Sequence, residues 1–244
     1  MRLDRFLANA GLGTRTEVKA MIRKGQVKVD GETCRNPQTR LDEKQRSAVC
    51  LNDVPVELKG RIHIMLHKPA GVITAMDDPR QPTIAGLIPD RCRTADLFPV
   101  GRLDLDTTGL LLLTNDGTLG HRLTGPRWQV DKTYLVTFVG SPFVPADVEQ
   151  FRQGIQLADG TICRPAGLEI QGENQVLLTI HEGKFHQVKR MMLATGREVK
   201  ALHRQSIGPL VLDHRLAPGD CRELTAEETD QLYAWVGLDR TYNQ

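Results

Sequence analysis

The sequence predicts an α+β fold divided into a small N-terminal domain at 1–59 and a larger domain at 60–244. The first observation is that strand-like patterns with a period of two alternate with helix-like patterns in the second part of the chain. The strand-like segments are 133–139 and 175–180, and the helix-like segments are 145–154, 186–195 and 226–236. The second observation is a boundary at 54–61, where Pro55 and Gly60 follow two short helical segments and a strand.

In the N-terminal part, residues 3–10 are typical of a short helix that ends at Gly11. Thr14 and Glu17 have the spacing of a capping box, so a second helix should begin there. Its apolar and basic residues fall on separate faces; they are Val18, Met21 and Ile22 on one face and Arg15, Lys19 and Arg23 on the other. Gly25 is a candidate C-cap, 26–29 alternates like a strand, and Asp30-Gly31 indicates a tight turn.

The net charge of the chain is +2, but its N-terminal segment is strongly basic. Within residues 1–28 there are seven bases against two acids; the bases are Arg2, Arg5, Arg15, Lys19, Arg23, Lys24 and Lys28. A basic patch on a nearly neutral protein is what binding to a phosphate backbone requires. These seven residues are therefore candidates for RNA contact.

Residues 1–59 resemble the S4 RNA-binding domain. The resemblance is carried by Arg2-Leu3-Asp4, by Gly13-Thr14-Arg15 and by the segment 25–31, which reads GQVKVDG. It implies that this domain binds RNA. The alternative is a small helix pair whose basic residues only contribute to solubility.

The larger domain should open with a strand at 62–66 that stops at Lys68-Pro69. From 75 to 99 the sequence has four prolines and many charges, which predicts an irregular segment with a short helix near 84–87. Leu110–Leu113 is an apolar run between turn residues and indicates a fully buried strand.

The composition excludes several classes of protein. The longest strongly apolar run has four residues, far below the roughly 20 needed to span a bilayer. The N-terminus lacks the apolar stretch of a signal peptide. An odd number of cysteines without a close pair argues against a disulfide framework or a zinc site; they are Cys34, Cys50, Cys92, Cys163 and Cys221. We expect a cytoplasmic protein with no membrane partner and no metal.

The stretch 101–117 holds the densest group of candidate catalytic side chains. Asp104 and Asp106 lie two residues apart beside Arg102, in a glycine-bracketed loop that enters the buried strand. The residues alone allow an acid with a charge partner and, equally, a loop whose side chains cap their own backbone. Residues 104–108 also fit the Asp-x-Asp-x-Thr signature of magnesium-dependent phosphatases. That signature should end an apolar strand, whereas here the apolar strand follows it.

The longer stretch GRLDLDTTGLLLLTNDG resembles the signature of pseudouridine synthases, specifically the small-subunit branch called RsuA. Further segments agree with this family; they are His67-Lys68-Pro69-Ala70-Gly71, Asp77-Asp78-Pro79, Pro82-Thr83, 131–136 and 182–191. The resemblance implies a catalytic domain with a mixed, mainly antiparallel sheet. It also implies breakage of a uridine N-glycosidic bond, rotation of the base and rejoining through C5, without a cofactor.

The resemblance also assigns roles to residues. Asp104 becomes the essential aspartate, as nucleophile or as base at the ribose, and a nearby cation should keep it ionised. Tyr134 would stack on the target base and help remove the C5 proton, although its alternating strand equally suits a core tyrosine. Arg102 would fill the space that a flipped base leaves.

Lys189 and Arg190 compete as the cation beside Asp104. On a helical wheel the apolar side is defined by Phe185, Val188, Met191, Met192 and Leu193. Lys189 lies roughly 70° from the centre of that side and Arg190 roughly 170° away. Lys189 is thus the better candidate for a partly buried partner, and Arg190 for a phosphate contact.

The whole pattern predicts a monomeric enzyme that isomerises a uridine of 16S ribosomal RNA, position 516 in the RsuA branch. Asp77-Asp78-Pro79 and 132–134 favour this branch over synthases that act on 23S ribosomal RNA. A magnesium phosphatase and a non-catalytic ribosome-binding factor are the more distant alternatives.

Overall fold

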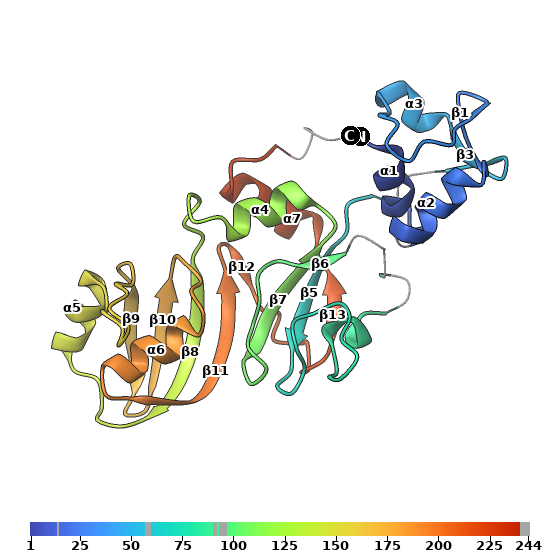
Figure 1. Cartoon of the computed structure of the whole chain (residues 1–244). Helices are drawn as coiled ribbons and strands as arrows, with labels where there is room; N and C mark the ends of the chain where they lie inside the picture. Colours follow the sequence, from blue (N-terminus) through green and yellow to red (C-terminus); the bar gives the residue numbers. More distant parts are fainter. Residues whose placement is uncertain (14, 57–59, 90–91, 93–96, 240–244) are drawn as a thin grey trace. The chain divides into compact units, whose positions relative to one another are not determined.

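The computed structural model describes residues 1–13, 15–56, 60–89, 92 and 97–239. The chain forms two compact units (Figure 1). The first comprises Met1–Ile62 with Ile88–Phe98, and the second comprises His63–Leu87 with Pro99–Gln244.

The first unit combines three helices with a small antiparallel sheet in its described residues. Its helices are α1 (Leu3–Asn9), α2 (Arg15–Arg23) and α3 (Glu43–Ser47). Its strands run in the order β2-β1-β3-β4; they are β1 (Val27–Val29), β2 (Glu32–Thr33), β3 (Val49–Leu51) and β4 (Val54–Pro55). The core side chains come from both layers and include Leu3, Phe6, Leu7, Val18, Ile22 and Val49.

The local expectations for this unit are largely confirmed. On α2, Val18 and Ile22 are buried and Met21 is partly buried, while Arg15 and Arg23 are exposed. The position of Thr14, and with it the expected capping box, lies outside the described residues.

The two expected glycine positions are confirmed by backbone geometry. Gly25, just past α2, has φ +76°, which suits a C-cap. Asp30 and Gly31 have φ +52° and +80° between β1 and β2. This is the geometry of the tight hairpin turn that their sequence predicts.

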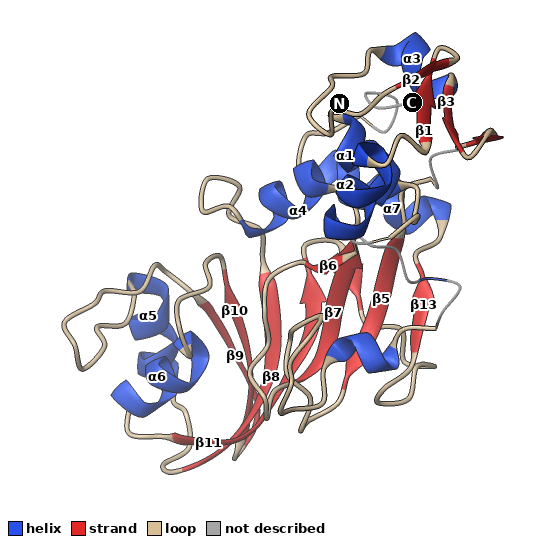
Figure 2. Ribbon diagram, turned by 45° about the vertical axis from the view of Figure 1, so that its right-hand side comes forward, coloured by secondary structure: helices blue, strands red, loops and turns tan. Residues whose placement is uncertain are grey.

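The second unit is built on a mixed, mainly antiparallel sheet, as expected (Figure 2). The strands of this part of the chain are β5 (His63–Lys68), β6 (Phe98–Pro99), β7 (Thr108–Thr114), β8 (Lys132–Val139), β9 (Gly167–Gly172), β10 (Gln175–Ile180), β11 (Glu198–Ile207), β12 (Leu210–Val211) and β13 (Cys221–Glu223). Their order in the sheet is β13-β5-β7-β11-β8-β10-β9, with β12 beside β11. Along this order only the β7–β11 pair is parallel among the described residues.

Helices cover this sheet at several places. They are the 3₁₀ helix η1 (Ile84–Leu87) and the α-helices α4 (Gly117–Thr124), α5 (Pro145–Gln153), α6 (Gln187–Ala194) and α7 (Ala226–Trp235). Helix α5 packs against β9 and α6 against β11. The expected helices at 145–154, 186–195 and 226–236 are confirmed to within one or two residues, but α4 and the long strand β11 were not expected. No helix in the described part of the chain is long and apolar enough to cross a membrane.

The buried strand expected at Leu110–Leu113 is the middle of β7. All four leucines have no exposed surface, because β7 lies between β5 and β11 and both of its faces are covered. On one face Leu110 and Leu112 pack in a core with residues of α4 and α7, such as Leu119 and Leu232.

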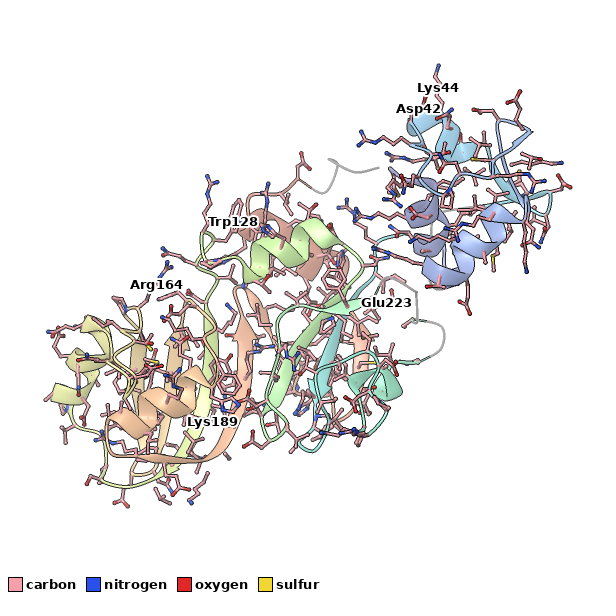
Figure 3. The ribbon with its side chains drawn as sticks, viewed as in Figure 1. Asp42, Lys44, Trp128, Arg164, Lys189 and Glu223 are labelled. Atoms are coloured by element: carbon pink, nitrogen blue, oxygen red, sulfur yellow. The ribbon has the colours of Figure 1, made fainter. Side chains whose placement is uncertain are left out.

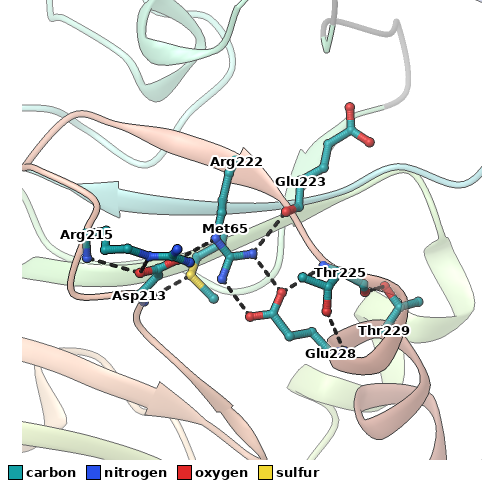
Figure 4. Close-up of polar contacts among 8 residues, drawn as sticks. All are labelled: Met65, Asp213, Arg215, Arg222, Glu223, Thr225, Glu228 and Thr229. Carbon is teal, nitrogen blue, oxygen red and sulfur yellow. Dashed lines mark hydrogen bonds and ion pairs between the residues drawn. The ribbon is translucent and has the colours of Figure 1, made fainter.

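An arginine network anchors α7 beside the sheet (Figure 4). Arg222 on β13 donates to Asp213 at 2.8 Å and to both carboxylate oxygens of Glu228 at 2.7 Å. Glu228 also accepts from the backbone N–H of Thr225, whose hydroxyl accepts from the N–H of Glu228, so the two residues form a capping box. The Arg222 guanidinium lowers the pKa of the Glu228 carboxyl.

Gly109 allows β7 to approach β11 closely. It pairs with Arg204, and its φ is +104°. A Cβ atom added there would lie 2.3 Å from the carbonyl oxygen and 2.6 Å from the nitrogen of Arg204. Those are backbone atoms in the centre of a sheet, so they cannot move aside as a flexible side chain would.

This contact predicts that Gly109→Ala is strongly destabilising. The added methyl group meets the β11 backbone and the positive φ is unfavourable for alanine, which together cost roughly 2–5 kcal/mol. Thermal unfolding followed by circular dichroism should show a lower midpoint. Gly172→Ala is the matched control, because a Cβ atom there has no neighbour within 4 Å. Equal midpoints for the two variants would contradict the close approach of β7 and β11.

Candidate active site

A pocket opens where the loop before β7 meets β8 and the segment that leads into α6. Its lining includes Arg102, Asp104, Tyr134, His186 and Lys189. Its volume is about 90 Å³. Drug-sized ligands occupy pockets of roughly 300–1,000 Å³, so this one suits only a single small group.

Asp104 and Lys189 form an ion pair at the pocket, with 3.1 Å between Oδ2 and Nζ. Lys189, labelled on α6 in Figure 3, also binds Asp106 at 2.6 Å. Burial alone would lower the pKa of Lys189, but its hydrogen bonds to Asp106 and Asp104 outweigh burial and raise it. The hydrogen bond from Lys189 also lowers the pKa of Asp106. The arrangement provides a carboxylate beside a firmly charged cation.

The two carboxylates differ in their surroundings. The side chain of Asp104 is 30% exposed and lines the pocket. The side chain of Asp106 is 70% exposed and is not part of the pocket lining. Of this pair, Asp104 is therefore the carboxylate positioned to meet a bound group.

Structure separates the two cations that the helical wheel compared. Lys189 lies next to Asp104, whereas Arg190 pairs with Asp159 at 2.5 Å. The wheel itself was wrong in part, since Phe185 is 77% and Leu193 67% exposed. Phe185 precedes the first residue of α6, so helical periodicity does not apply to it.

Tyr134 on β8 is almost fully buried, at 7% exposure, and lines the pocket. It lies on the same face of the strand as Val136 and Phe138, which are buried. Arg102 is exposed at the pocket. The structure thus brings Asp104, Lys189, Tyr134 and Arg102 to one place.

Lys68, at the end of β5, holds the Asp104 loop through hydrogen bonds to its backbone. Its side chain is fully buried, and its ammonium donates to the carbonyl oxygens of Pro69 and Thr107 at 2.9 Å. It also donates to the carbonyls of Asp104 at 3.1 Å and Leu105 at 3.4 Å. Burial lowers the pKa of Lys68 to about 8, against a partial increase from Asp106 and Asp104. One cation therefore satisfies the backbone of most of the loop.

Two further contacts fix the loop to the segment after β5. The Thr74 hydroxyl donates to the Leu103 carbonyl at 2.7 Å and accepts from the Leu103 N–H at 3.1 Å. The N–H of Gly71 donates to the Leu105 carbonyl at 2.8 Å. With both ends tied, the Asp104 backbone is held in place before any ligand binds.

The basic residues of the first unit have mixed surroundings. Arg2 pairs with Asp4 at 2.6 Å and Lys28 with Asp53 at 2.6 Å. Arg5, Arg15, Arg23 and Lys24 are exposed. Lys19 is partly buried on α2. Within the described residues, no group of three or more histidine, cysteine or acidic side chains is arranged to hold a metal ion.

Comparisons with known proteins agree with this geometry. Residues 62–194, more than half of the chain, match the family model described as RNA pseudouridylate synthase. The chain belongs to the RNA pseudouridylate synthase family. Residues 1–47 match the S4 domain, as the sequence predicts. The chain is therefore a pseudouridine synthase, and the phosphatase interpretation of residues 104–108 falls away.

Relatives of this synthase cover nearly its whole length. It is 43% identical to ribosomal small subunit pseudouridine synthase A of Vibrio cholerae, over 96% of this chain and 100% of that one. It is 44% identical to the protein of the same name from Escherichia coli K12, over 93% and 98%. A crystal structure described as pseudouridylate synthase has a TM-score of 0.68 and 38% identity, covering 95% of this chain and 99% of that one.

Sequence reasoning missed two residues at the synthase site. Lys68 was visible in the segment His67-Lys68-Pro69, but nothing in its pattern showed that its side chain turns toward a loop some forty residues later. His186 was counted within the family segment 182–191 and as the start of a helix, without a role at the site. Its Nε2 lies 3.6 Å from Asp104 Oδ1, and its φ of +49° is unusual for histidine.

The environment of Lys68 predicts an alkaline limit to activity. Above pH 8 the ammonium loses its proton, and the neutral amine turns a lone pair toward the carbonyls of the loop. We expect the single-turnover rate to fall as pH rises through about 8, approaching tenfold per pH unit. The folded pKa lies below the ordinary 10.5, so between those values the unfolded chain holds this proton and the folded chain does not. The free energy of unfolding therefore does not fall as pH rises through this range.

Lys68→Arg provides the comparison, because a guanidinium stays charged throughout this range. A folded Lys68→Arg enzyme should keep its rate to higher pH than the wild type. The same alkaline limb in both enzymes, with unchanged melting midpoints, would assign the titration to another group.

Proposed function

We propose that this synthase isomerises a uridine of small-subunit ribosomal RNA to pseudouridine, with uridine 516 as the target that its RsuA-like sequence favours. The proposal is supported by the S4 domain and by relatives named for the small ribosomal subunit. The observation that carries the chemistry is Asp104 paired with Lys189 in a small pocket that Tyr134 and Arg102 also line. A synthase acting on 23S ribosomal RNA is the second candidate.

In this proposal Asp104 acts on the ribose as nucleophile or as base. Lys189 pairs with the Asp104 carboxylate at 3.1 Å and orients it toward the bound nucleotide. The C1′–N1 bond breaks, the base rotates, and C5 bonds to C1′. The C5 proton then leaves, and a nitrogen of the ring gains one, so the product is an isomer of the substrate.

Tyr134 and Arg102 would control the base during this sequence. The Tyr134 ring at the pocket suits stacking on uracil, and its hydroxyl suits removal of the C5 proton. Arg102 would occupy the gap in the RNA that the flipped nucleotide leaves, which offsets part of the few kcal/mol that flipping costs. Arg190 would contact phosphate, in exchange for or alongside Asp159.

The remaining parts of the proposal concern binding. Domain 1–59 would bind RNA through the seven basic residues of its first 28 positions, and domain 60–244 would perform the chemistry. The enzyme would act as a monomer in the cytoplasm, where ribosomal RNA is made and assembled. Arg15, Lys19 and Arg23 recur every four residues along α2 and would form its main contact with phosphates.

Pseudouridine mapping tests both the target and Asp104. In cells that lack the gene, we expect one pseudouridine of 16S ribosomal RNA to disappear and to return with the wild-type gene. Asp104→Asn should fail to restore it, although this nearly isosteric change preserves folding. Asp106→Asn is the matched control and should restore it, since Asp106 also pairs with Lys189 but lies outside the pocket lining. A site lost only from 23S ribosomal RNA would overturn the target, and restoration by Asp104→Asn would overturn the catalytic role.

The basic face of α2 can be tested through salt dependence. Changing Arg15, Lys19 and Arg23 together to Gln should leave the core intact, since none of them packs in it. RNA affinity should weaken, and the slope of log K against log salt should shrink by about 0.7–0.9 per lost contact, roughly 2–3 in all. The control replaces Arg152 and Lys200, two exposed bases of the other unit, and should leave the slope unchanged. Equal slopes for all three proteins would show that α2 does not contact phosphates.

A further inference from the structure

Phe185 is the most exposed large apolar side chain in the described part of the chain, at 77%. Its ring stacks on the imidazole of His186, with centroids 3.8 Å apart and planes 19° from parallel. One face of the phenyl ring is therefore covered by His186, and the other is open to solvent. An apolar ring in this position costs solvation free energy unless a partner covers it.

The exposure of Phe185 follows from a well-fixed backbone. The buried side chain of Gln187 accepts from the Lys184 N–H at 2.9 Å and donates to Glu182 at 2.8 Å. The N–H of Gln187 donates in turn to the Lys184 carbonyl at 3.1 Å. These bonds close a tight turn around Phe185 and direct its side chain outward. The open ring is thus presented before any partner arrives.

The position of this stack connects it with the reaction. His186 lines the pocket, and its Nε2 lies 3.6 Å from the Oδ1 of Asp104. A planar group placed on the free face of Phe185 would therefore continue a stack that begins beside the catalytic carboxylate. Aromatic side chains hold unpaired bases in this way in single-stranded RNA sites.

We propose that Phe185 and His186 form a stacking platform for the nucleobase next to the target uridine in the RNA substrate. When the uridine enters the pocket, its neighbour loses a stacking partner in the RNA. Phe185 replaces that partner, so the flipped state becomes less costly. The inference rests on the proposed function only in that the substrate is an RNA with a flipped uridine.

Single-turnover kinetics on the mapped RNA substrate test the platform. Base–aromatic stacking predicts that Phe185→Ala lowers kcat/KM by about 5- to 150-fold, while Phe185→Tyr stays close to wild type. Leu193→Ala is the matched control, because Leu193 is similarly exposed, at 67%, on α6, the helix that follows Phe185. It should have no effect. Circular dichroism should show the same melting midpoint for all variants, because Phe185 contributes nothing to the core.

A second substrate identifies the partner. Removing the base on one side of the target uridine should slow the wild-type enzyme by a similar factor but slow Phe185→Ala much less, since the stack is already lost. Full activity of Phe185→Ala, or independent losses with an abasic site on either side, would overturn the platform. The same holds if Phe185→Ala alters self-association instead of RNA kinetics. The RNA used is the one in which mapping locates the modification. A target on 23S ribosomal RNA would therefore overturn the proposed function and leave this test valid.

Discussion

The arrangement of the candidate active site depends on the ammonium of Lys68. Four backbone carbonyls between Pro69 and Thr107 converge on this one buried cation. A buried cation is costly unless it is well paired, and a loop with unpaired buried carbonyls is equally costly, so each stabilises the other. The result is that Asp104 projects from a backbone fixed by its own carbonyl oxygen. The ion pair with Lys189 then only has to orient the side chain.

The sequence predicted the individual helices and strands of this protein better than it predicted which strands pair in the sheet. Strand β7 and helices α5, α6 and α7 follow from periodicity, because local patterns determine whether a segment is a helix or a strand. The parallel pairing of β7 with β11 did not follow, since it joins distant segments and depends on the absence of a side chain at Gly109. The Asp104 loop was found through its motif, while the role of Lys68 needed the three-dimensional path of the chain.

Phe185 illustrates a different limit. The helical wheel placed Phe185 with the buried Val188 and Met191 because the pattern was extended two residues beyond the N-terminus of α6. The left-handed backbone of His186 interrupts the periodicity there and turns Phe185 outward. Residues that break a local rule in this way are expected at functional sites, and His186 lines the pocket.

The pairing of β7 with β11 also sets an order of events during synthesis of the chain. The core of the first unit draws on residues between Leu3 and Val56. The pocket, in contrast, needs Leu202 of β11 and the partner strand of Gly109, about 95 residues further on. Contacts between segments so distant in sequence form late, because a long loop must close first. A nascent chain released before β11 therefore has its S4 domain but no active site. Such a fragment would occupy RNA without modifying it.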